Sequence, residues 1–332
     1  MKRVFVTALL PGSSIDRLKE MFEVEVLALD RPAREDELLR GARNADALVT
    51  MVADPVRATL IEACPRLLVI ANCGVGYENI DVDAATKRGI IVTNTPGVLT
   101  EAVADLAWAL VLAVARRVAE GDSFVRRGMF KGWLPTLMLG KNIHGRVLGV
   151  FGMGSIGTAI AKRAKGFSMQ VIYHNRSRNI PGEEETGARW VPLPELLKAS
   201  DVLVIAAPLT PETRGRFGME EFQRMKRSSI LVNVGRGQIV KEKELVEALR
   251  RGVIWGAGLD VYEREPEVEE ELAHLPNTVL LPHVGSATEE TRTAMADIAC
   301  QSVADALTGR APAHIVNPAA LKRWRERVTQ KP

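Results

Sequence analysis

Short apolar runs rich in β-branched residues alternate with amphipathic stretches along the whole chain. In an amphipathic stretch such as residues 15–22, apolar residues recur at the three- and four-residue spacing of a helix. The apolar runs, in contrast, have the length and composition of buried strands. This alternation is typical of parallel sheets whose strands are connected by crossover helices. The pattern therefore predicts an α/β fold built from doubly wound parallel sheets.

The predicted strands fall into two groups. The first group lies at Val4–Leu9, Val24–Leu29, Ala47–Thr50, Leu67–Ala71 and Ile90–Thr93. The second group lies at Arg146–Phe151, Val171–Tyr173, Val202–Ala206, Ile230–Asn233, Gly256–Asp260 and Val279–Leu281. The mostly apolar residues Leu99–Ala119 between the groups predict one long buried helix. A last helix is predicted at Thr288–Leu307.

The chain is long enough for two domains, each with its own core. Too few strands follow the last predicted helix for a further sheet, so we expect the chain to return to its first domain. The expected boundaries are residues 1–99 plus 288–332 for a substrate domain and residues 100–287 for an inserted dinucleotide-binding domain. In this scheme the inserted domain is Rossmann-type and the other domain is flavodoxin-like.

Composition excludes several classes of protein. The formal net charge of +3 is spread along the chain, which gives no reason to expect nucleic acid as a partner. We expect a solvated helix end where basic residues gather near the C-terminus, at Lys322, Arg323, Arg325 and Arg327. No run approaches the ~20 apolar residues of a membrane helix, so no membrane is expected as a partner. The three cysteines are Cys64, Cys73 and Cys300. Because their number is odd, we expect a reducing cytoplasm and not a disulfide framework. Because they lack the spacing of metal ligands, we expect no metal.

A glycine-rich segment follows the predicted strand that ends at Phe151. It reads Gly152-Met153-Gly154-Ser155-Ile156-Gly157 and precedes a helix-forming run. In this context the first glycine permits a tight turn, the second lets the backbone approach a pyrophosphate, and the third lets helix and strand pack closely. The N-terminus of the helix, at Ser155 and Ile156, would then present N–H groups to the phosphates. The segment predicts a dinucleotide-binding site.

The residues after the next predicted strand bear on the choice between NAD and NADP. An NAD site usually has an acidic residue here, about twenty residues past the glycines, to bind the ribose 2′-hydroxyl. This segment has none and instead offers hydrogen-bond donors and positive charge at Asn175, Arg176, Ser177 and Arg178. Such groups favour the 2′-phosphate of NADP. We therefore predict NADPH as the preferred cofactor, with NAD also possible, and a solvated basic turn as the alternative.

Polar residues follow three later strands of the second group. Arg236 follows the strand at residues 230–234, Glu265 comes after the strand at 257–261, and His283 directly follows the strand at 279–282. In doubly wound sheets ligands bind at the carboxyl ends of the strands. Taken singly, each residue has an ordinary alternative: a surface ion pair, a loop acid and a core histidine.

The sequence resembles the D-isomer-specific 2-hydroxyacid dehydrogenase family, and within it the glyoxylate and hydroxypyruvate reductases. The resemblance covers nearly the whole chain. Besides the glycine loop, it rests on the blocks Gly74-Val75-Gly76-Tyr77-Glu78-Asn79-Ile80-Asp81, Thr93-Asn94-Thr95-Pro96-Gly97-Val98-Leu99-Thr100, Asn233-Val234-Gly235-Arg236-Gly237, Gly258-Leu259-Asp260-Val261 with Glu265-Pro266, and Pro282-His283-Val284-Gly285-Ser286-Ala287-Thr288.

The resemblance implies Arg236, Glu265 and His283 as the catalytic residues, a split-domain fold and a homodimer. It also implies that the N–H groups of Val75 and Gly76 hold the substrate carboxylate, together with Arg236 and His283. Trp133 matches a tryptophan that caps the partner subunit's pocket, a core or interface tryptophan being the alternative. Further cofactor contacts are implied at Pro208, Thr213, Val234, Asp260, Ser286 and Thr100.

Reduction of a 2-oxo acid explains why these three residue types are needed. Hydride transfer from a nicotinamide leaves negative charge on the carbonyl oxygen. Histidine supplies a proton, a neighbouring carboxylate favours its charged form, and arginine stabilises the developing charge. We expect glyoxylate or hydroxypyruvate as the substrate. The alternatives are a relative that acts on 3-phosphoglycerate, D-lactate or phosphite, and a nucleotide-sensing corepressor of the same fold.

Overall fold

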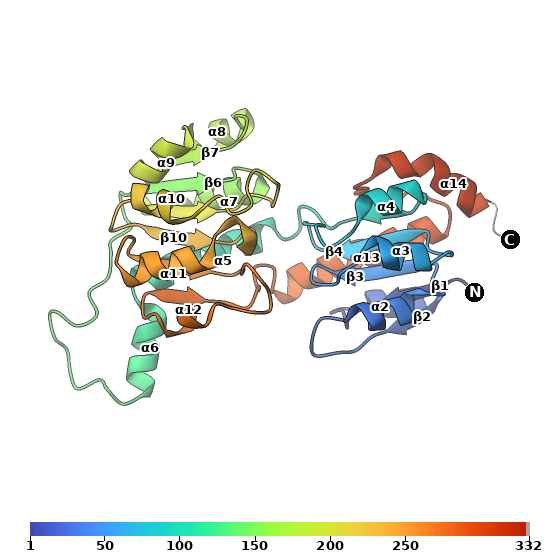
Figure 1. The fold of residues 1–332 in the computed structure, drawn as a ribbon, viewed down its shortest axis with the longest axis horizontal. Helices are drawn as coiled ribbons and strands as arrows, with labels where there is room; N and C mark the ends of the chain where they lie inside the picture. The colour runs from blue at the N-terminus through green and yellow to red at the C-terminus, as the bar shows by residue number, and fades with distance from the viewer. Residues whose placement is uncertain (330–332) are drawn as a thin grey trace. The chain divides into compact units, whose positions relative to one another are not determined.

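The computed structural model describes residues 1–329 and divides the chain into two compact units (Figure 1). Unit 1 contains Met1–Leu99 and the residues from Ala287 onward, and unit 2 contains Thr100–Ser286. Each unit has one parallel sheet with helices on both faces. The predicted fold class is confirmed.

The sheet of unit 1 has the strand order β2-β1-β3-β4-β5, which is that of flavodoxin-like folds. Its strands are β1 (Arg3–Val6), β2 (Glu23–Val26), β3 (Ala47–Met51), β4 (Val69–Cys73) and β5 (Ile91–Thr93). All five lie within the predicted runs or overlap them. β1 and β2 end before the predicted ends, and Leu9 is exposed, so the apolar run extends past the sheet.

Helices cover both faces of this sheet because its strands are apolar on both sides. Val4 and Val6 lie in one core and Phe5 in the other, as the two-residue period of a strand requires. The first core is covered by α1 and α13, and the second by α2, α3 and α4. The helices of unit 1 are α1 (Ser14–Lys19), α2 (Glu35–Ala42), α3 (Ala58–Ala63), α4 (Val82–Lys87), α13 (Glu289–Leu307) and α14 (Leu321–Thr329), with a 3-10 helix at Pro318–Ala320.

The C-terminal helix α14 packs onto unit 1. Trp324 is 1% exposed and lies in the core that α13 covers. Arg327 donates to the carbonyl groups of Pro65 and Arg88 at 2.9 and 3.0 Å, and Arg323 donates to that of Lys87. Lys322, Arg323 and Arg325 are exposed, as a solvated helix end requires, whereas Arg327 is half-buried. Arginine stems can cover apolar surface while their charged heads bind carbonyl groups, so charge alone did not indicate exposure.

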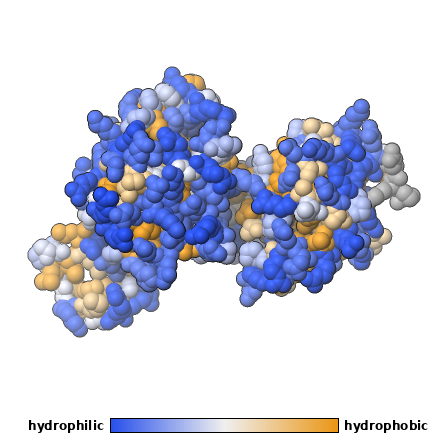
Figure 2. Space-filling model, in the orientation of Figure 1, coloured by the Kyte–Doolittle hydropathy of each residue, from blue (hydrophilic) through white to orange (hydrophobic). Residues whose placement is uncertain are grey.

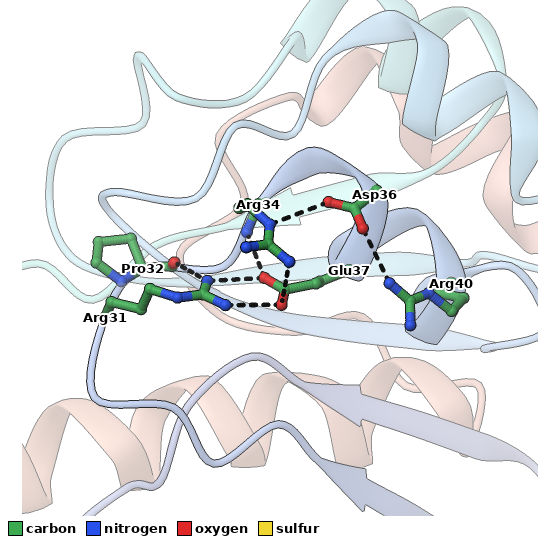
Figure 3. A network of polar contacts seen from close by, with 6 residues as sticks. All are labelled: Arg31, Pro32, Arg34, Asp36, Glu37 and Arg40. Carbon is green, nitrogen blue, oxygen red and sulfur yellow. Dashed lines mark hydrogen bonds and ion pairs between the residues drawn. The ribbon is translucent and has the colours of Figure 1, made fainter.

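A network of ion pairs fixes the N-terminus of α2 (Figure 3). The carboxylate of Glu37 accepts two hydrogen bonds from Arg31, each 2.8 Å long, and one from the backbone N–H of Arg34 at 2.9 Å. Arg31 and then Arg34 lower the pKa of Glu37 to about 2. Asp36 binds Arg34 and Arg40 beside it. The network thus attaches the loop between β2 and α2 to the first turn of α2.

The sheet of unit 2 has the order β12-β11-β10-β9-β6-β7-β8. From β8 this is the Rossmann order 3-2-1-4-5-6 with one strand added at the end, and the order reverses at β6. The strands are β6 (Val147–Phe151), β7 (Gln170–His174), β8 (Arg189–Trp190), β9 (Val202–Ile205), β10 (Ile230–Asn233), β11 (Gly256–Leu259) and β12 (Thr278–Leu280). Only β8 was not predicted, because two residues are too few to show a periodic pattern.

Two helices replace the single long helix predicted at Leu99–Ala119, so that prediction is wrong in its C-terminal part. The first ends at Ala115, and Arg117 has a left-handed φ of 55°, which breaks the helix. Among the described residues no helix is long and apolar enough to cross a membrane. The helices of unit 2 are α5 (Thr100–Ala115), α6 (Val118–Arg126), α7 (Ser155–Arg163), α8 (Ile180–Thr186), α9 (Leu193–Ala199), α10 (Met219–Arg224), α11 (Glu242–Arg250) and α12 (Glu270–His274), with 3-10 helices at Ala164–Phe167 and Gly237–Ile239.

Candidate active site

The glycine-rich loop connects β6 to α7 at the point where the strand order of unit 2 reverses. Gly152 has a φ of 101°, and a Cβ on it would lie 2.4 Å from the backbone nitrogen of Ala207. A Cβ on Gly157 would lie 2.3 Å from the carbonyl oxygen of Gly152. A Cβ on Gly154, in contrast, would meet nothing within 4 Å. The outer glycines are needed by the protein's own packing, and the space beside Gly154 fits the phosphates of a dinucleotide.

Two asparagines fix the backbone of this loop. Asn175 accepts the N–H of Met153 on Oδ1 at 2.6 Å, and Asn179 donates from Nδ2 to the carbonyl oxygen of Met153 at 2.8 Å. Asn179 also accepts the N–H of Gly182 and so caps α8. The side chain of Asn175 thus shapes the glycine-rich loop. Sequence reasoning missed Asn179, although an asparagine just before Ile180-Pro181 is a helix-start signal.

The two arginines after β7 differ in their surroundings. Arg178 forms a double hydrogen bond with Glu183, with 3.0 Å between Nε and Oε1, and Tyr173 donates its hydroxyl to the same carboxylate at 2.6 Å. Arg178 and then Tyr173 lower the pKa of Glu183 to about 2. Arg176 and Ser177 are exposed and make no hydrogen bond or ion pair with the residues that the structure describes. The N–H donors of Arg176 are therefore available to bind a ligand.

The other residues implied as cofactor contacts lie after strands of unit 2 or at its limits. Pro208 follows β9, and its carbonyl accepts the hydroxyl of Thr213 at 2.8 Å. Val234 directly follows β10, and Asp260 directly follows β11. Thr100 begins α5 and Ser286 is the last residue of unit 2.

Arg236, Glu265 and His283 follow the adjacent strands β10, β11 and β12. Nδ1 of His283 lies 2.7 Å from Oε2 of Glu265, and the two side chains are 36% and 33% exposed. Oε1 of Glu265 accepts the N–H of Tyr262 at 2.9 Å. Burial raises the pKa of Glu265, but the bond and charge of His283, the N–H of Tyr262 and the charge of Arg236 together lower it below its ordinary value. The structure therefore brings together the three residues that the sequence singled out.

Asp260 holds the backbone that carries His283. Its carboxylate, 2% exposed, accepts the N–H groups of Val284 and Gly285 at 2.7 and 2.8 Å. His283 itself has a φ of 53°, in the left-handed region that non-glycine residues seldom adopt. Burial raises the pKa of Asp260. The resemblance implies Asp260 as a cofactor contact. The structure shows that Asp260 also binds the backbone next to His283, which adopts this uncommon conformation.

The backbone at Arg236 is fixed by its neighbours. Asn233 donates to the carbonyl of Arg236 and accepts the N–H of Gly235, both at 3.0 Å. Arg236 donates from its guanidinium to the carbonyl of Gly235 at 2.8 Å. A Cβ on Gly237 would lie 1.8 Å from the carbonyl group of Tyr262, so only glycine permits the close approach of these two segments.

Val75 and Gly76, implied as substrate contacts, lie after β4 in unit 1. Asn94 donates to the carbonyl of Val75 at 2.8 Å, and Asn72 donates to that of Gly76 at 2.7 Å. Within the described chain, the N–H groups of Val75 and Gly76 have no acceptor. The two asparagines, to which sequence reasoning gave no role, hold the loop by its carbonyl groups and leave its N–H groups available to an anion.

Trp133 lies in the segment between α6 and β6 and is 81% exposed. Within its own chain it is neither a core residue nor part of the cluster around His283.

A family model described as "D-isomer specific 2-hydroxyacid dehydrogenase, NAD binding domain" matches residues 108–285, which is more than half of the chain. The chain belongs to the D-isomer-specific 2-hydroxyacid dehydrogenase family. This 2-hydroxyacid dehydrogenase is thus an NAD(P)-dependent oxidoreductase, and the matched residues lie in unit 2.

Individual relatives are similar over almost the whole dehydrogenase chain. A glyoxylate reductase from Thermococcus gammatolerans is 46% identical over 324 residues, which cover 96% of this chain and 97% of the relative. The crystal structure of a protein from Thermus thermophilus superposes with a TM-score of 0.90 at 46% identity and covers 95% of this chain and 99% of that one. An NADPH-dependent glyoxylate/hydroxypyruvate reductase from Sinorhizobium meliloti, solved with NADP and malonate, has a TM-score of 0.83 at 36% identity and covers 96% and 97%.

Proposed function

We propose that this dehydrogenase uses NADPH in preference to NADH to reduce a small 2-oxo acid, glyoxylate or hydroxypyruvate, to the 2-hydroxy acid. The observation that carries the proposal is the 2.7 Å bond between Glu265 and His283, with Arg236 close enough to lower the pKa of the same carboxyl. The names of the Thermococcus and Sinorhizobium relatives support this choice of substrate.

Each of the three residues has a role that follows from its chemistry. When bound, the cofactor supplies a hydride to the carbonyl carbon of the substrate. His283 holds its Nδ1 proton against Glu265 and makes no hydrogen bond through Nε2 with the described residues, so Nε2 carries the proton given to the carbonyl oxygen. Glu265 stabilises the charged imidazole and sets the ring orientation. Arg236 stays charged throughout and stabilises the negative charge that develops on oxygen.

The preference for NADPH rests on Arg176 and Ser177. Both are exposed after β7, at the position where an acid would bind the ribose of NAD. Arg178 is paired with Glu183, so Arg176 is the residue that we assign to the 2′-phosphate, with Ser177 as an additional donor. Asn175 contributes by holding Met153 in the glycine loop.

We assign the substrate carboxylate to the N–H groups of Val75 and Gly76. Unit 1 then acts as the substrate domain, and unit 2 as the dinucleotide-binding domain inserted into it. The support is local: both carbonyl groups of this loop are bound by asparagines, and neither N–H is used within the described residues.

We also propose that the enzyme is a homodimer that joins through α6 and the segment after it. Exposed apolar side chains gather there, at Val118, Val125, Met129, Phe130, Trp133, Leu134 and Leu139. In Figure 2, orange and pale residues gather at the lower left, over α6 and the segment after it, with blue residues beside them. Such patches mark protein–protein contacts, and in a dimer Trp133 would be placed to cap the partner's substrate pocket.

A steady-state assay with a panel of substrates tests the function. Purified protein is expected to oxidise NADPH with glyoxylate or hydroxypyruvate, and to do so with a higher kcat/KM than with NADH. Faster turnover of 3-phosphohydroxypyruvate or pyruvate, or of phosphite with an oxidised cofactor, would assign it to another activity of the family. Cofactor binding without turnover of any of these compounds would identify a nucleotide sensor.

A further inference from the structure

Few buried side chains anchor the loop that carries Glu265. It connects β11 to α12, and the residues from Arg264 to Val268 are exposed. The carboxylate of Glu265 must nevertheless stay within hydrogen-bond reach of His283 for this pair to work. Polar attachments therefore have to fix the loop.

Glu242 provides such an attachment on both sides of Glu265. It is the first residue of α11 and is 4% exposed. One oxygen of its carboxylate accepts the N–H of Glu263, and the other accepts the N–H of Glu269 at 3.4 Å. In return, its own N–H donates to the carboxylate of Glu263 at 3.1 Å. One buried side chain thus joins the two ends of the loop to the start of a helix.

Stability alone does not explain a carboxylate at this position. Glu242 forms no ion pair with the Lys or Arg residues that the structure describes. Burial raises the pKa of its carboxyl, the two N–H groups oppose this, and the nearby carboxylates of Glu263 and Glu269 add to it. A buried charge without a cation is unfavourable unless its hydrogen bonds compensate, and an apolar residue of similar size is often as stable.

We propose that Glu242 is a positioning residue for the acid–base pair: by binding the N–H groups of Glu263 and Glu269, it fixes the loop that keeps Glu265 against His283. The inference rests on the reductase function proposed above, because it assigns Glu242 to the geometry of that reaction. Glu242 touches neither substrate nor cofactor in this scheme and acts only through Glu265.

The test is Glu242→Gln, which keeps the size of the side chain but replaces one accepting oxygen by an NH₂ group. One loop N–H then loses its acceptor. We expect kcat for glyoxylate with NADPH to fall ~10-fold, about the factor that one hydrogen bond is worth, with KM for NADPH unchanged.

A double-mutant cycle separates positioning from general stability. If Glu242 acts through Glu265, then Glu242→Gln has no further effect on kcat in a Glu265→Gln background. The matched control is Glu244→Gln on the same helix, whose carboxylate accepts the N–H of Met219 at the start of α10. We expect this control to lower Tm and to leave kcat unchanged.

The outcomes distinguish the two proposals. Wild-type kcat in Glu242→Gln, beside an impaired Glu265→Gln, would overturn the role of Glu242 and leave the reductase function intact. A Glu265→Gln enzyme as active as the wild type would remove Glu265, and with it Glu242, from the reaction, whereas a wild-type enzyme that oxidises NADPH with none of the 2-oxo acids would overturn the proposed function itself. If Glu242→Gln does not fold, Glu242→Asp, which is one methylene too short to reach both N–H groups, is measured against the same expectations.

Discussion

Asp260 and His283 are linked through the backbone: the carboxylate of Asp260 binds the N–H groups of the two residues that follow His283. The histidine is thereby held at a φ of 53° with its Nδ1 directed at Glu265. Fixed geometry of this kind is what proton transfer to a developing oxyanion requires, because a misplaced donor loses much of its effect.

Replacing His283 by alanine removes the proposed proton donor. We expect kcat for glyoxylate to fall ~100-fold or more, the usual effect of losing a positioned acid, with cofactor binding retained. His274→Gln, at the exposed end of α12, is the control and is expected to keep full activity. Near-normal turnover of His283→Ala would exclude the histidine from the reaction.

Glu265→Gln removes the negative charge beside His283. The pKa of Glu265 is lowered below its ordinary value, so the carboxylate is ionised at neutral pH. Its contribution to the stability of the folded protein is therefore present above the ordinary value of about 4.3. That contribution is lost only as pH falls through the lower pKa of the folded state. Without this carboxylate, Nδ1 of His283 loses the acceptor that orients the ring. We expect kcat for glyoxylate with NADPH to fall while KM for NADPH stays the same, and an unchanged kcat would contradict the pairing.

Arg176→Ala is expected to weaken binding of NADPH only. Loss of a charge-assisted hydrogen bond to the 2′-phosphate should raise KM for NADPH ~10- to 100-fold, while KM for NADH stays the same. Arg178→Ala is the comparison, since its guanidinium is paired with Glu183. A larger NADPH-specific effect in Arg178→Ala than in Arg176→Ala would reverse the assignment.

Asn175→Ala should affect both cofactors alike. Its amide binds the backbone of Met153, so its loss loosens the loop that faces the pyrophosphate, which NADH and NADPH share. We expect KM to rise ~5-fold for each, the effect of about one hydrogen bond. If only KM for NADPH rises, Asn175 contacts the 2′-phosphate and its bond to Met153 is secondary.

Trp324→Ala should destabilise unit 1. The side chain is 1% exposed in the core under α14, and truncation of a buried tryptophan costs about 3–5 kcal/mol. Its Nε1 has no partner among the described residues, so Trp324→Phe, which keeps most of the apolar contact, is expected to be much milder. Thermal unfolding followed by circular dichroism measures both variants, and equal Tm values for Trp324→Ala and the wild type would show that the packing of Trp324 does not stabilise unit 1.

The sequence predicted features that depend on neighbours along the chain. Periodicity located the strands, and the glycine spacing located the tight turn between β6 and α7 at Gly152–Gly157. The roles of Arg236, Glu265 and His283 needed the resemblance to a family, because each residue alone had an ordinary alternative. The break between α5 and α6 was not predicted. It depends on the left-handed φ of Arg117 alone, and the apolar pattern of the sequence continues across it.

Side chains that bind backbone far along the chain were also missed. Asn179 binds Met153, Asp260 binds Val284 and Gly285, and Glu242 binds Glu263 and Glu269. Each pair is formed only once strands and helices have packed, so no local pattern indicates it. These polar contacts decide the geometry of the site, whereas the reactive residues decide its chemistry.

The return of the chain to unit 1 affects how the protein folds during synthesis. A ribosome synthesises the whole of unit 2 before it makes α13 and α14, which cover one face of the sheet of unit 1. The nascent chain must therefore keep that apolar face, including Val4 and Val6, out of aggregates while a complete nucleotide-binding body folds downstream of it. Although synthesised first, the N-terminal strands acquire their native cover last.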